Sequence, residues 1–345
     1  MKKIRILSID GGGIRGIIPG TILAEFEKIL QRHSNSTKKI GDYFDMIAGT
    51  STGGILACIY LMPGDDGNAK YSAQDAVNLY IKNGHTIFAR SFVQKVGSLG
   101  GISHQKYSQD QLYKLLTTYF GDVTLDKVIK PSLITSYEIT DRKAVFFTSA
   151  DARADPMDNF YVRDVARATS AAPTYFSPAH IKSMNGQSFA LIDGGVFANN
   201  PALCAYAEAR KLEFSKFFKG SLKKDKPTAA DMFILSLGTG SVQKRYSYDG
   251  FKNAGEIKWL EPIIDILMSG NSETVAYQLR QMYLTLEPEN QKNYYRLEPG
   301  LKEACSEMDE ATPENIQNLY QAGLTFVHDK KDLLEEIAQK IVENE

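Results

Sequence analysis

Residues 43–61 read Tyr-Phe-Asp-Met-Ile-Ala-Gly-Thr-Ser-Thr-Gly-Gly-Ile-Leu-Ala-Cys-Ile-Tyr-Leu, and this stretch decides the fold. Its first part, Tyr43–Ala48, predicts a short buried strand. Gly49–Gly54 predicts a tight turn, and Ile55–Leu61 predicts a helix. The stretch is therefore a strand that passes through a glycine-rich turn directly into a helix.

A second unit of the same kind comes first in the chain. Ile4–Ile9 predicts a strand, the glycines at positions 11, 12, 13 and 16 predict a turn, and the apolar periodicity of Ile17–Gln31 predicts a helix. Two such units in succession favour an α/β fold, in which a largely parallel sheet carries helices on its faces.

The rest of the chain adds both strands and helices. Helices are expected over residues 71–82 and from Asn200-Pro201 to about Lys211, and further strands over residues 131–139, 143–149, 188–192 and 232–237. Because turns at Asp141-Arg142 and Asn185-Gly186 join neighbouring strands, the sheet should be mixed. Lys216–Lys226 is expected to be an exposed loop.

The last third is expected to be mainly helical. Leu333, Leu334, Ile337 and Ile341 fall on one helical stripe. We therefore expect a catalytic domain over residues 1–245 and a helical C-terminal extension, packed on the same domain, over residues 246–345.

The composition narrows the class of protein. The 345 residues are 43% hydrophobic and 23% charged, as in a folded globular protein. Lys and Arg total 40 against 41 for Asp and Glu, so no basic excess indicates a nucleic-acid polymer as partner. The cysteines Cys58, Cys204 and Cys305 are odd in number and far apart, which argues against disulfides or zinc and favours a reducing, cytoplasmic location.

Apolar runs are short throughout. The segment after the first lysines is too short for an export signal, and Ile55–Met62 is far below the roughly 20 residues of a membrane span. Any membrane contact is therefore expected to be peripheral.

Gly49-Thr50-Ser51-Thr52-Gly53 matches G-x-S-x-G, the pattern of a nucleophile elbow, in the strand-turn-helix context that the pattern requires. The glycines leave room for a sharp turn that holds the serine in a strained conformation. Its hydroxyl then lies at a helix N-terminus, where the dipole favours negative charge on a bound substrate. Taken alone, the motif is equally compatible with an ordinary polar turn.

Asp10–Gly16 contains a formal G-x-G-x-x-G between a strand and a helix. As a dinucleotide motif it is weak, since no acidic residue ends the next strand about 20 positions on, and no Walker lysine follows the glycines. The alternative is an oxyanion hole built from the N–H groups of Gly11, Gly12 and Gly13, each donor contributing about 3 kcal/mol in the transition state. Arg15 would add positive charge nearby.

A nucleophilic serine needs a base, and in an α/β-hydrolase a histidine follows the acid. Four histidines precede the best acid candidate, and the fifth lies in a stretch without the signature of a site: His33, His85, His104, His180 and His328. The base should therefore be a carboxylate. Asp193, which ends a predicted strand and precedes two glycines, is the candidate, although Asp-Gly is also a common turn. An apolar environment would raise its pKa and make it a stronger base.

Four blocks together resemble the patatin-like phospholipase family: Asp10–Gly16, Gly49–Gly53, Ala168–Phe176 and Asp193–Gly195. They occur in that family's order across roughly residues 1–205, and no family motif could be placed after about residue 245. The resemblance implies a three-layer α/β/α sandwich and a Ser51–Asp193 dyad in place of a triad. It also implies an oxyanion hole from Gly11, Gly12 and Gly13, no cofactor or metal, and hydrolysis of fatty acyl esters of phospholipids or lysophospholipids.

Several expectations concern regulation and partners. Residues 87–92, Ile-Phe-Ala-Arg-Ser-Phe, are a candidate lid or membrane-touching element, although Phe at such spacing is more often core. A phospholipase effector of anti-phage defence that a cyclic dinucleotide activates is the alternative function, and a catalytically silent scaffold is a third. A homodimer is a further expectation.

Overall fold

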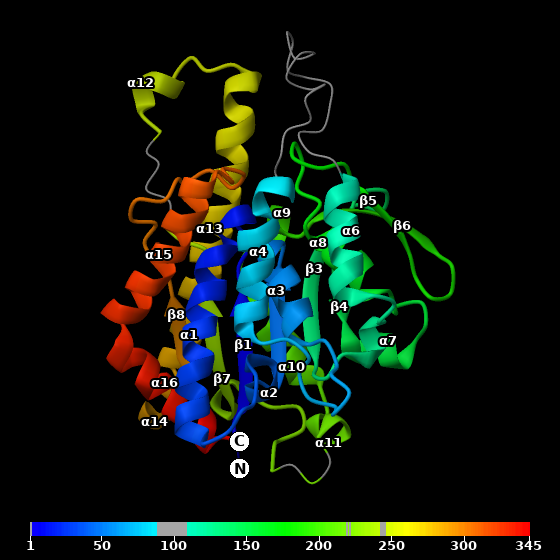
Figure 1. Cartoon of the computed structure of the whole chain (residues 1–345), viewed down its shortest axis with the longest axis vertical. Coiled ribbons are helices and arrows are strands. Elements are labelled where there is room, and N and C mark those ends of the chain that lie inside the picture. The colour runs from blue at the N-terminus through cyan, green and yellow to red at the C-terminus, as the bar shows by residue number, and fades with distance from the viewer. Residues whose placement is uncertain (1, 88–108, 219, 221, 242–245) are drawn as a thin grey trace.

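One sheet organises the chain (Figure 1). The computed structural model describes residues 2–87, 109–218, 220, 222–241 and 246–345, and within them the sheet has eight strands in the order β5-β6-β3-β2-β1-β7-β8, with β4 also paired to β3. The strands are β1 (Ile4–Ile9), β2 (Met46–Thr50), β3 (Ser132–Glu138), β4 (Lys143–Thr148), β5 (Ala179–Lys182), β6 (Ser188–Asp193), β7 (Met232–Leu237) and β8 (Tyr294–Leu297).

The sheet is mixed, as predicted. β1 pairs in parallel with β2 and β7, and β3 and β8 extend this parallel part at either side. β4 and β6 run antiparallel to β3, and β5 antiparallel to β6. Every residue of β1 and β7 is buried, because helices cover both faces of these apolar strands.

The two faces of the sheet belong to two separate hydrophobic cores. Leu7 and Ile9 of β1 point into one core, and Ile4 and Ile6 into the other, as the alternation of side chains along a strand requires. Helices on the first face are α1 (Ile17–Ser34), α3 (Thr52–Tyr60), α4 (Ala73–Ile87), α6 (Gln109–Phe120), α8 (Val162–Thr169), α15 (Pro313–Asp329) and α16 (Lys331–Glu343). α10 (Ala202–Lys211) and α13 (Glu256–Leu284) cover the second face, which completes the predicted three-layer α/β/α sandwich.

Shorter elements connect these layers. They are α2 (Ile40–Tyr43), α7 (Ser149–Ala154), α9 (Gly195–Ala198), α11 (Phe214–Phe217), α12 (Tyr248–Phe251) and α14 (Pro288–Gln291), together with the 3-10 turns η1 (Gly13–Gly16), η2 (Leu125–Lys127) and η3 (Ala229–Asp231). In the described part of the chain, no helix is both long enough and apolar enough to cross a bilayer.

Three details of the predicted elements differ from the structure. The strand expected at residues 43–48 lies at Met46–Thr50, because the preceding residues form α2, at whose start the Asp42 carboxylate accepts the N–H of Lys39 at 3.0 Å. The helix after Asn200 has Pro201, and not Asn200, as its N-cap, although the Asn200 side chain accepts the N–H of Ala202 at 3.0 Å. The sequence also gave no signal for β5 or β8.

Residues 246–345 are built into the same layers. β8 pairs in parallel with β7 at the edge of the sheet. The expected stripe on α16 is buried at Leu334, Ile337 and Ile341 and partly buried at Leu333.

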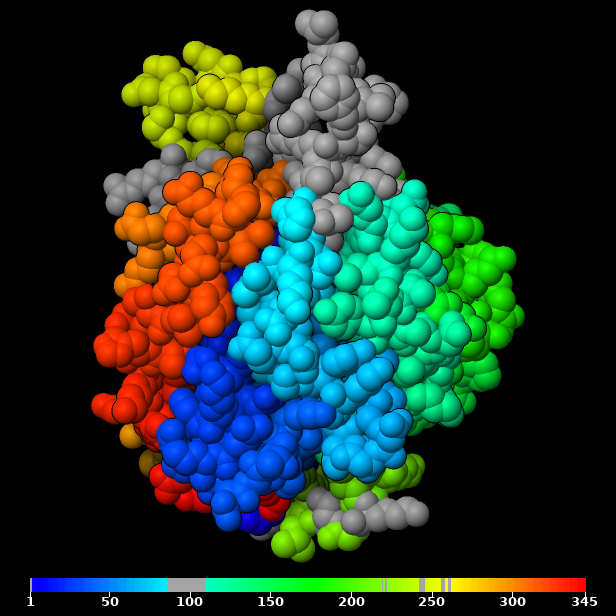
Figure 2. All heavy atoms as spheres, in the orientation of Figure 1, coloured from blue at the N-terminus to red at the C-terminus, as the bar shows by residue number. Residues whose placement is uncertain are grey.

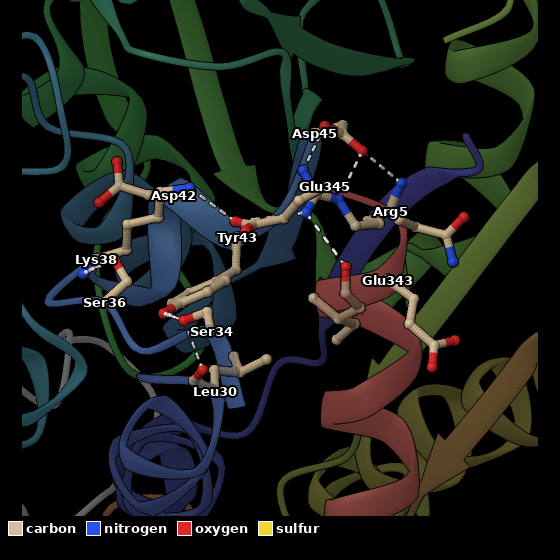
Figure 3. Close-up of polar contacts among 12 residues, drawn as sticks. Arg5, Leu30, Ser34, Ser36, Lys38, Asp42, Tyr43, Asp45, Glu343 and Glu345 are labelled. Carbon is tan, nitrogen blue, oxygen red and sulfur yellow. Dashed lines mark hydrogen bonds and ion pairs between the residues drawn. The ribbon is translucent and has the colours of Figure 1, made fainter. Parts of the chain in front are cut away.

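Both ends of the chain lie at the amino ends of the parallel strands (Figure 1). There Asp45 accepts the Nη2 of Arg5 at 3.0 Å and also pairs with Lys223, and the Nη1 of Arg5 lies 3.9 Å from the carboxylate of Glu345 (Figure 3). Because the Nη1 of Arg5 also donates to the carbonyl of Ile341 at 3.4 Å, this polar cluster ties the last turn of α16 to β1. The glycine-rich loops follow the strands at the opposite edge of the sheet.

Candidate active site

Ser51 occupies the sharp turn between β2 and α3. Its φ of 55° and ψ of −123° form a conformation that is strained for a residue with a side chain. A Cβ atom at Gly49 would lie 2.2 Å from the carbonyl oxygen of Gly53, and one at Gly53 would lie 2.2 Å from that of Ile9. The turn therefore requires both glycines of the motif. The N–H of Ser51 donates to the Oγ1 of Thr169 at 2.8 Å, which holds the turn against α8.

Asp193, at the end of β6, lies beside this serine. Its carboxylate accepts the N–H of Gly195 at 2.7 Å, and the Ser51 hydroxyl lies close enough to lower the pKa of the same carboxyl. Asp193 is 4% exposed and Ser51 7% exposed. Burial raises the pKa of Asp193 from 3.8 to about 7, against the opposing effect of the Ser51 hydroxyl and the Gly195 N–H, which both lower it. At neutral pH this carboxyl can therefore both accept and return a proton.

The glycine loop after β1 borders the same site, but its amides differ in availability. The N–H of Gly11 donates to the carbonyl of Asn199 at 3.1 Å, and the carbonyl of Gly11 accepts a hydrogen bond from the Oγ1 of Thr239 at 2.7 Å. The N–H of Gly11 is therefore occupied by Asn199. This differs from the prediction that Gly11 donates to an oxyanion hole. Gly13, at φ 60°, lines the pocket beside Ser51, and a Cβ atom there would lie 2.2 Å from the carbonyl oxygen of Met308.

Arg15 acts on the backbone of this loop. Its N–H and its Nε both donate to the carbonyl of Gly12, at 3.2 and 3.3 Å. In a trans peptide the N–H points opposite to the carbonyl, so these bonds fix the direction of the Gly13 N–H. The guanidinium is buried, which lowers the pKa of Arg15, and it is not among the residues that line the pocket. Arg15 therefore contacts the backbone of the glycine loop. It does not line the pocket in which the oxyanion would form.

The residue before the glycines is held by the C-terminal part of the chain. Arg296 of β8 donates Nη1 and Nη2 to the two carboxylate oxygens of Asp10 at 2.8 and 2.7 Å. Ser272 of α13 adds a hydrogen bond at 3.2 Å to the same carboxylate. Asp10 is 2% exposed. A buried, two-pronged ion pair of this kind restrains the loop, because both charges would be left unpaired if it moved.

Replacing Arg296 by methionine should destabilise the protein by about 3–5 kcal/mol, since the Asp10 carboxylate would stay buried without its cation. We also expect kcat to fall at least tenfold, as the glycine loop loses its anchor. Urea unfolding followed by circular dichroism measures the first effect. The double variant Asp10→Asn/Arg296→Met, which removes both charges, should recover most of the stability. A single variant as stable as the wild type would show that the pair does not restrain the loop.

A pocket opens above Ser51 and Asp193. Its empty space, including the solvent at its mouth, is about 990 Å³. Most of its lining is aliphatic or aromatic, and none of the described lining residues is Lys, Arg or His: Gly13, Ser51, Thr52, Ile55, Leu79, Tyr80, Leu112, Leu116, Ser170, Ala172, Pro173, Tyr175, Phe176, Asp193, Gly195, Val196, Ile264, Leu267, Met268 and Met308. Such a lining suits a hydrocarbon chain with a reactive polar group at one end.

Two other predicted features can now be placed. Of the histidines in the described ranges, His33 pairs with Glu335 on the surface and none lines the pocket, in agreement with a carboxylate as the base. The candidate lid at residues 87–92 lies outside the described residues, apart from Ile87 at the end of α4.

Several residues of this arrangement escaped the sequence reasoning. Thr169, Asn199, Thr239 and Arg296 position the serine turn or the glycine loop. Thr169 belongs to the recognised block 168–176, so that block could have indicated a role near the serine. Asn199 follows the block 193–195 by four residues but belongs to no recognised pattern, and Thr239 and Arg296 lie far from the motifs along the chain.

Comparison with known proteins adds independent information. The family model described as patatin-like phospholipase matches residues 7–206. Patatin-like protein 2 of Oryza sativa subsp. indica is 36% identical over 345 residues, covering 94% of this chain and 83% of the relative. Patatin-like protein 1 of Arabidopsis thaliana is 34% identical (93% and 80% covered), and patatin group J-1 of Solanum tuberosum is 32% identical (94% and 84% covered). These alignments extend well past residue 206, into the region without a recognised motif.

Proposed function

Because the chain belongs to the patatin-like phospholipase family, we propose that it hydrolyses fatty acyl esters of phospholipids or lysophospholipids, with Ser51 as nucleophile and Asp193 as base. Hydrolysis of lipid esters in general follows from the family. The roles of the two residues rest on one observation, the position of the Ser51 hydroxyl beside a buried carboxyl whose pKa is raised to about 7.

The first half of the reaction forms an acyl-enzyme. Asp193 takes the proton of the Ser51 hydroxyl while Oγ attacks the ester carbonyl carbon. The oxyanion that forms is held by backbone N–H groups. The N–H of Gly11 is bonded to Asn199, so the candidate donors in the glycine loop are the N–H groups of Gly12 and Gly13. The N–H of Thr52 at the start of α3 is a third candidate donor. When the carbon–oxygen bond to the alcohol breaks, Asp193 returns the proton to the leaving oxygen.

The second half releases the fatty acid. Water attacks the acyl carbonyl and gives a proton to Asp193, the second tetrahedral intermediate uses the same N–H groups, and Ser51 leaves with the proton from Asp193. One carboxyl thus acts as base and acid in turn, which its pKa near neutrality favours.

A panel of lipids with one acyl chain and different head groups tests this function. Since no cationic side chain lines the described pocket, we expect palmitate release from lysophosphatidylcholine, lysophosphatidylglycerol and monopalmitoylglycerol at rates within about tenfold of one another. Mass spectrometry of the released acid measures this. Absence of release from every ester would contradict the proposed function, and a hundredfold preference for one head group would show that recognition lies outside the pocket.

Two expectations on partners stay predictions: a cyclic dinucleotide activator and a homodimer. The corresponding alternative, a ligand-switched phospholipase, differs from a constitutive hydrolase in one measurable respect. Cyclic dinucleotides should raise both the melting temperature and the rate only if the switched enzyme is the right description.

A further inference from the structure

One face of α13 is apolar and exposed. Trp259, Ile263, Ile266 and Leu267 follow one another at helical spacing and are 37%, 46%, 44% and 55% exposed. We call these four residues the α13 stripe. A helix of a globular protein normally turns such a face toward the core, and a contiguous exposed apolar surface generally marks a site of interaction.

The stripe begins on a projecting knob. α12 and the first turns of α13 stand out from the body at the edge where the carboxyl ends of the parallel strands lie (Figures 1 and 2). The ring of Phe251 packs edge-on against Trp259, with centroids 4.8 Å apart, and against Tyr246 at 5.3 Å. Nearby Tyr248 is 81% exposed. Aromatic side chains with a polar atom, such as Trp and Tyr, favour the interface between lipid and water.

The other end of the stripe reaches the pocket above Ser51. Leu267 is exposed and also lines the pocket, and Ile264 and Met268 on the adjoining side of the helix line it as well. Val196 likewise lines the pocket and is 37% exposed. The apolar surface therefore continues from the knob into the cavity that would receive an acyl chain.

We propose that the α13 stripe docks on a lipid surface, so that an acyl chain passes from the lipid into the pocket along Leu267 and Val196. The choice of lipid over a protein partner rests on the proposed function and on this continuity. The attraction should be apolar rather than electrostatic, because the described side chains of residues 246–268 carry no net charge: Lys252 and Lys258 against Asp249 and Asp265.

Intrinsic fluorescence offers a direct test, because Trp259 is the only tryptophan of the chain. Vesicles of phosphatidylcholine alone should shift its emission to shorter wavelength, and lipids brominated on their acyl chains should quench it. The Ser51→Ala variant should respond in the same way, since docking does not need hydrolysis. Added salt should not weaken the response. An unchanged spectrum, or a response that needs anionic lipid and disappears in salt, would overturn the proposal.

A matched pair of variants separates docking from catalysis. Ile263→Glu/Ile266→Glu changes stripe residues that are not among the pocket lining, whereas Tyr277→Glu/Leu284→Glu changes two residues of the same helix that are 62% and 54% exposed. The first variant should lose vesicle binding and at least tenfold of its activity on vesicles, while its hydrolysis of soluble p-nitrophenyl butyrate stays within about twofold. The second should match the wild type throughout.

The remaining outcomes show whether the docking proposal or the hydrolase proposal is wrong. Equal vesicle binding by both variants would overturn the docking proposal and leave the hydrolase proposal intact, provided that p-nitrophenyl butyrate is still cleaved. Vesicle binding that only the stripe variant loses, without cleavage of any ester by the wild type, would contradict the hydrolase proposal and leave the docking proposal intact. A dimer in sedimentation that only the stripe variant disrupts, without an effect of vesicles, would assign the stripe to a second copy of the chain instead of lipid.

Discussion

Ser51→Ala will lower hydrolysis of p-nitrophenyl butyrate at least about 10⁴-fold, while the protein stays folded. The large effect is expected because the hydroxyl forms the covalent bond to the acyl group, and none of the described residues offers a free hydroxyl or thiol beside Asp193 that could replace it. A fluorophosphonate probe should label the wild type at one residue and the variant not at all. Persisting turnover or labelling in the variant would exclude Ser51 as the nucleophile.

Two controls make this result specific. Ser170 lines the same pocket, but its hydroxyl is already donated to the carbonyl of Ala166 at 2.7 Å, so Ser170→Ala should change the rate less than tenfold. Ser51→Gly should be as inactive as Ser51→Ala but about 1 kcal/mol more stable, because glycine relieves the strain at φ 55°. Thermal unfolding of the two variants measures this difference.

The parts of the site that follow directly on a strand could be predicted from the sequence. The runs Ile4–Ile9 and Met232–Leu237 are mostly apolar, with only Arg5, Ser8 and Ser236 as polar residues, so their composition and flanking residues identify them as buried strands. Gly49 and Gly53 mark the turn around Ser51 because only glycine fits there. Such features are encoded by neighbouring residues, and sequence patterns record them well.

Contacts between distant segments could not be predicted in this way. β8 has only four residues, and its pairing with β7 depends on the whole intervening chain. The ion pair of Asp10 with Arg296 joins the loop after the first strand to the last strand, and neither residue carries a local pattern that indicates the other. The same holds for Gly11: three glycines in a row predict available amides, and only the position of Asn199 shows that one of them is used.

Asp193→Asn should reduce kcat at least about 10³-fold, because the amide cannot take the proton of Ser51. In the wild type, kcat/KM should rise with pH and level off above about pH 7, falling roughly tenfold per unit below it, since only the ionised carboxyl acts as base. Rates on p-nitrophenyl butyrate between pH 5 and pH 9 measure this profile. A rate independent of pH between 5 and 7 would contradict the assignment of Asp193 as the base.

The same substitution should stabilise the fold at alkaline pH, which separates loss of function from loss of structure. A carboxyl whose pKa is raised from 3.8 to about 7 binds its proton more tightly in the folded state, so stability falls as pH rises through this window and stays reduced above it. Each pKa unit corresponds to about 1.4 kcal/mol, so ionised Asp193 costs the native state up to about 4 kcal/mol at pH 8. Asparagine does not ionise, and Asp193→Asn should therefore be the more stable protein at pH 8 and about equal to the wild type near pH 4. If denaturant unfolding showed the variant to be less stable at both pH values, the stabilisation of the ionised carboxyl by Ser51 and Gly195 would outweigh the burial of the charge, and the pKa of Asp193 would have to lie close to that of an ordinary carboxyl.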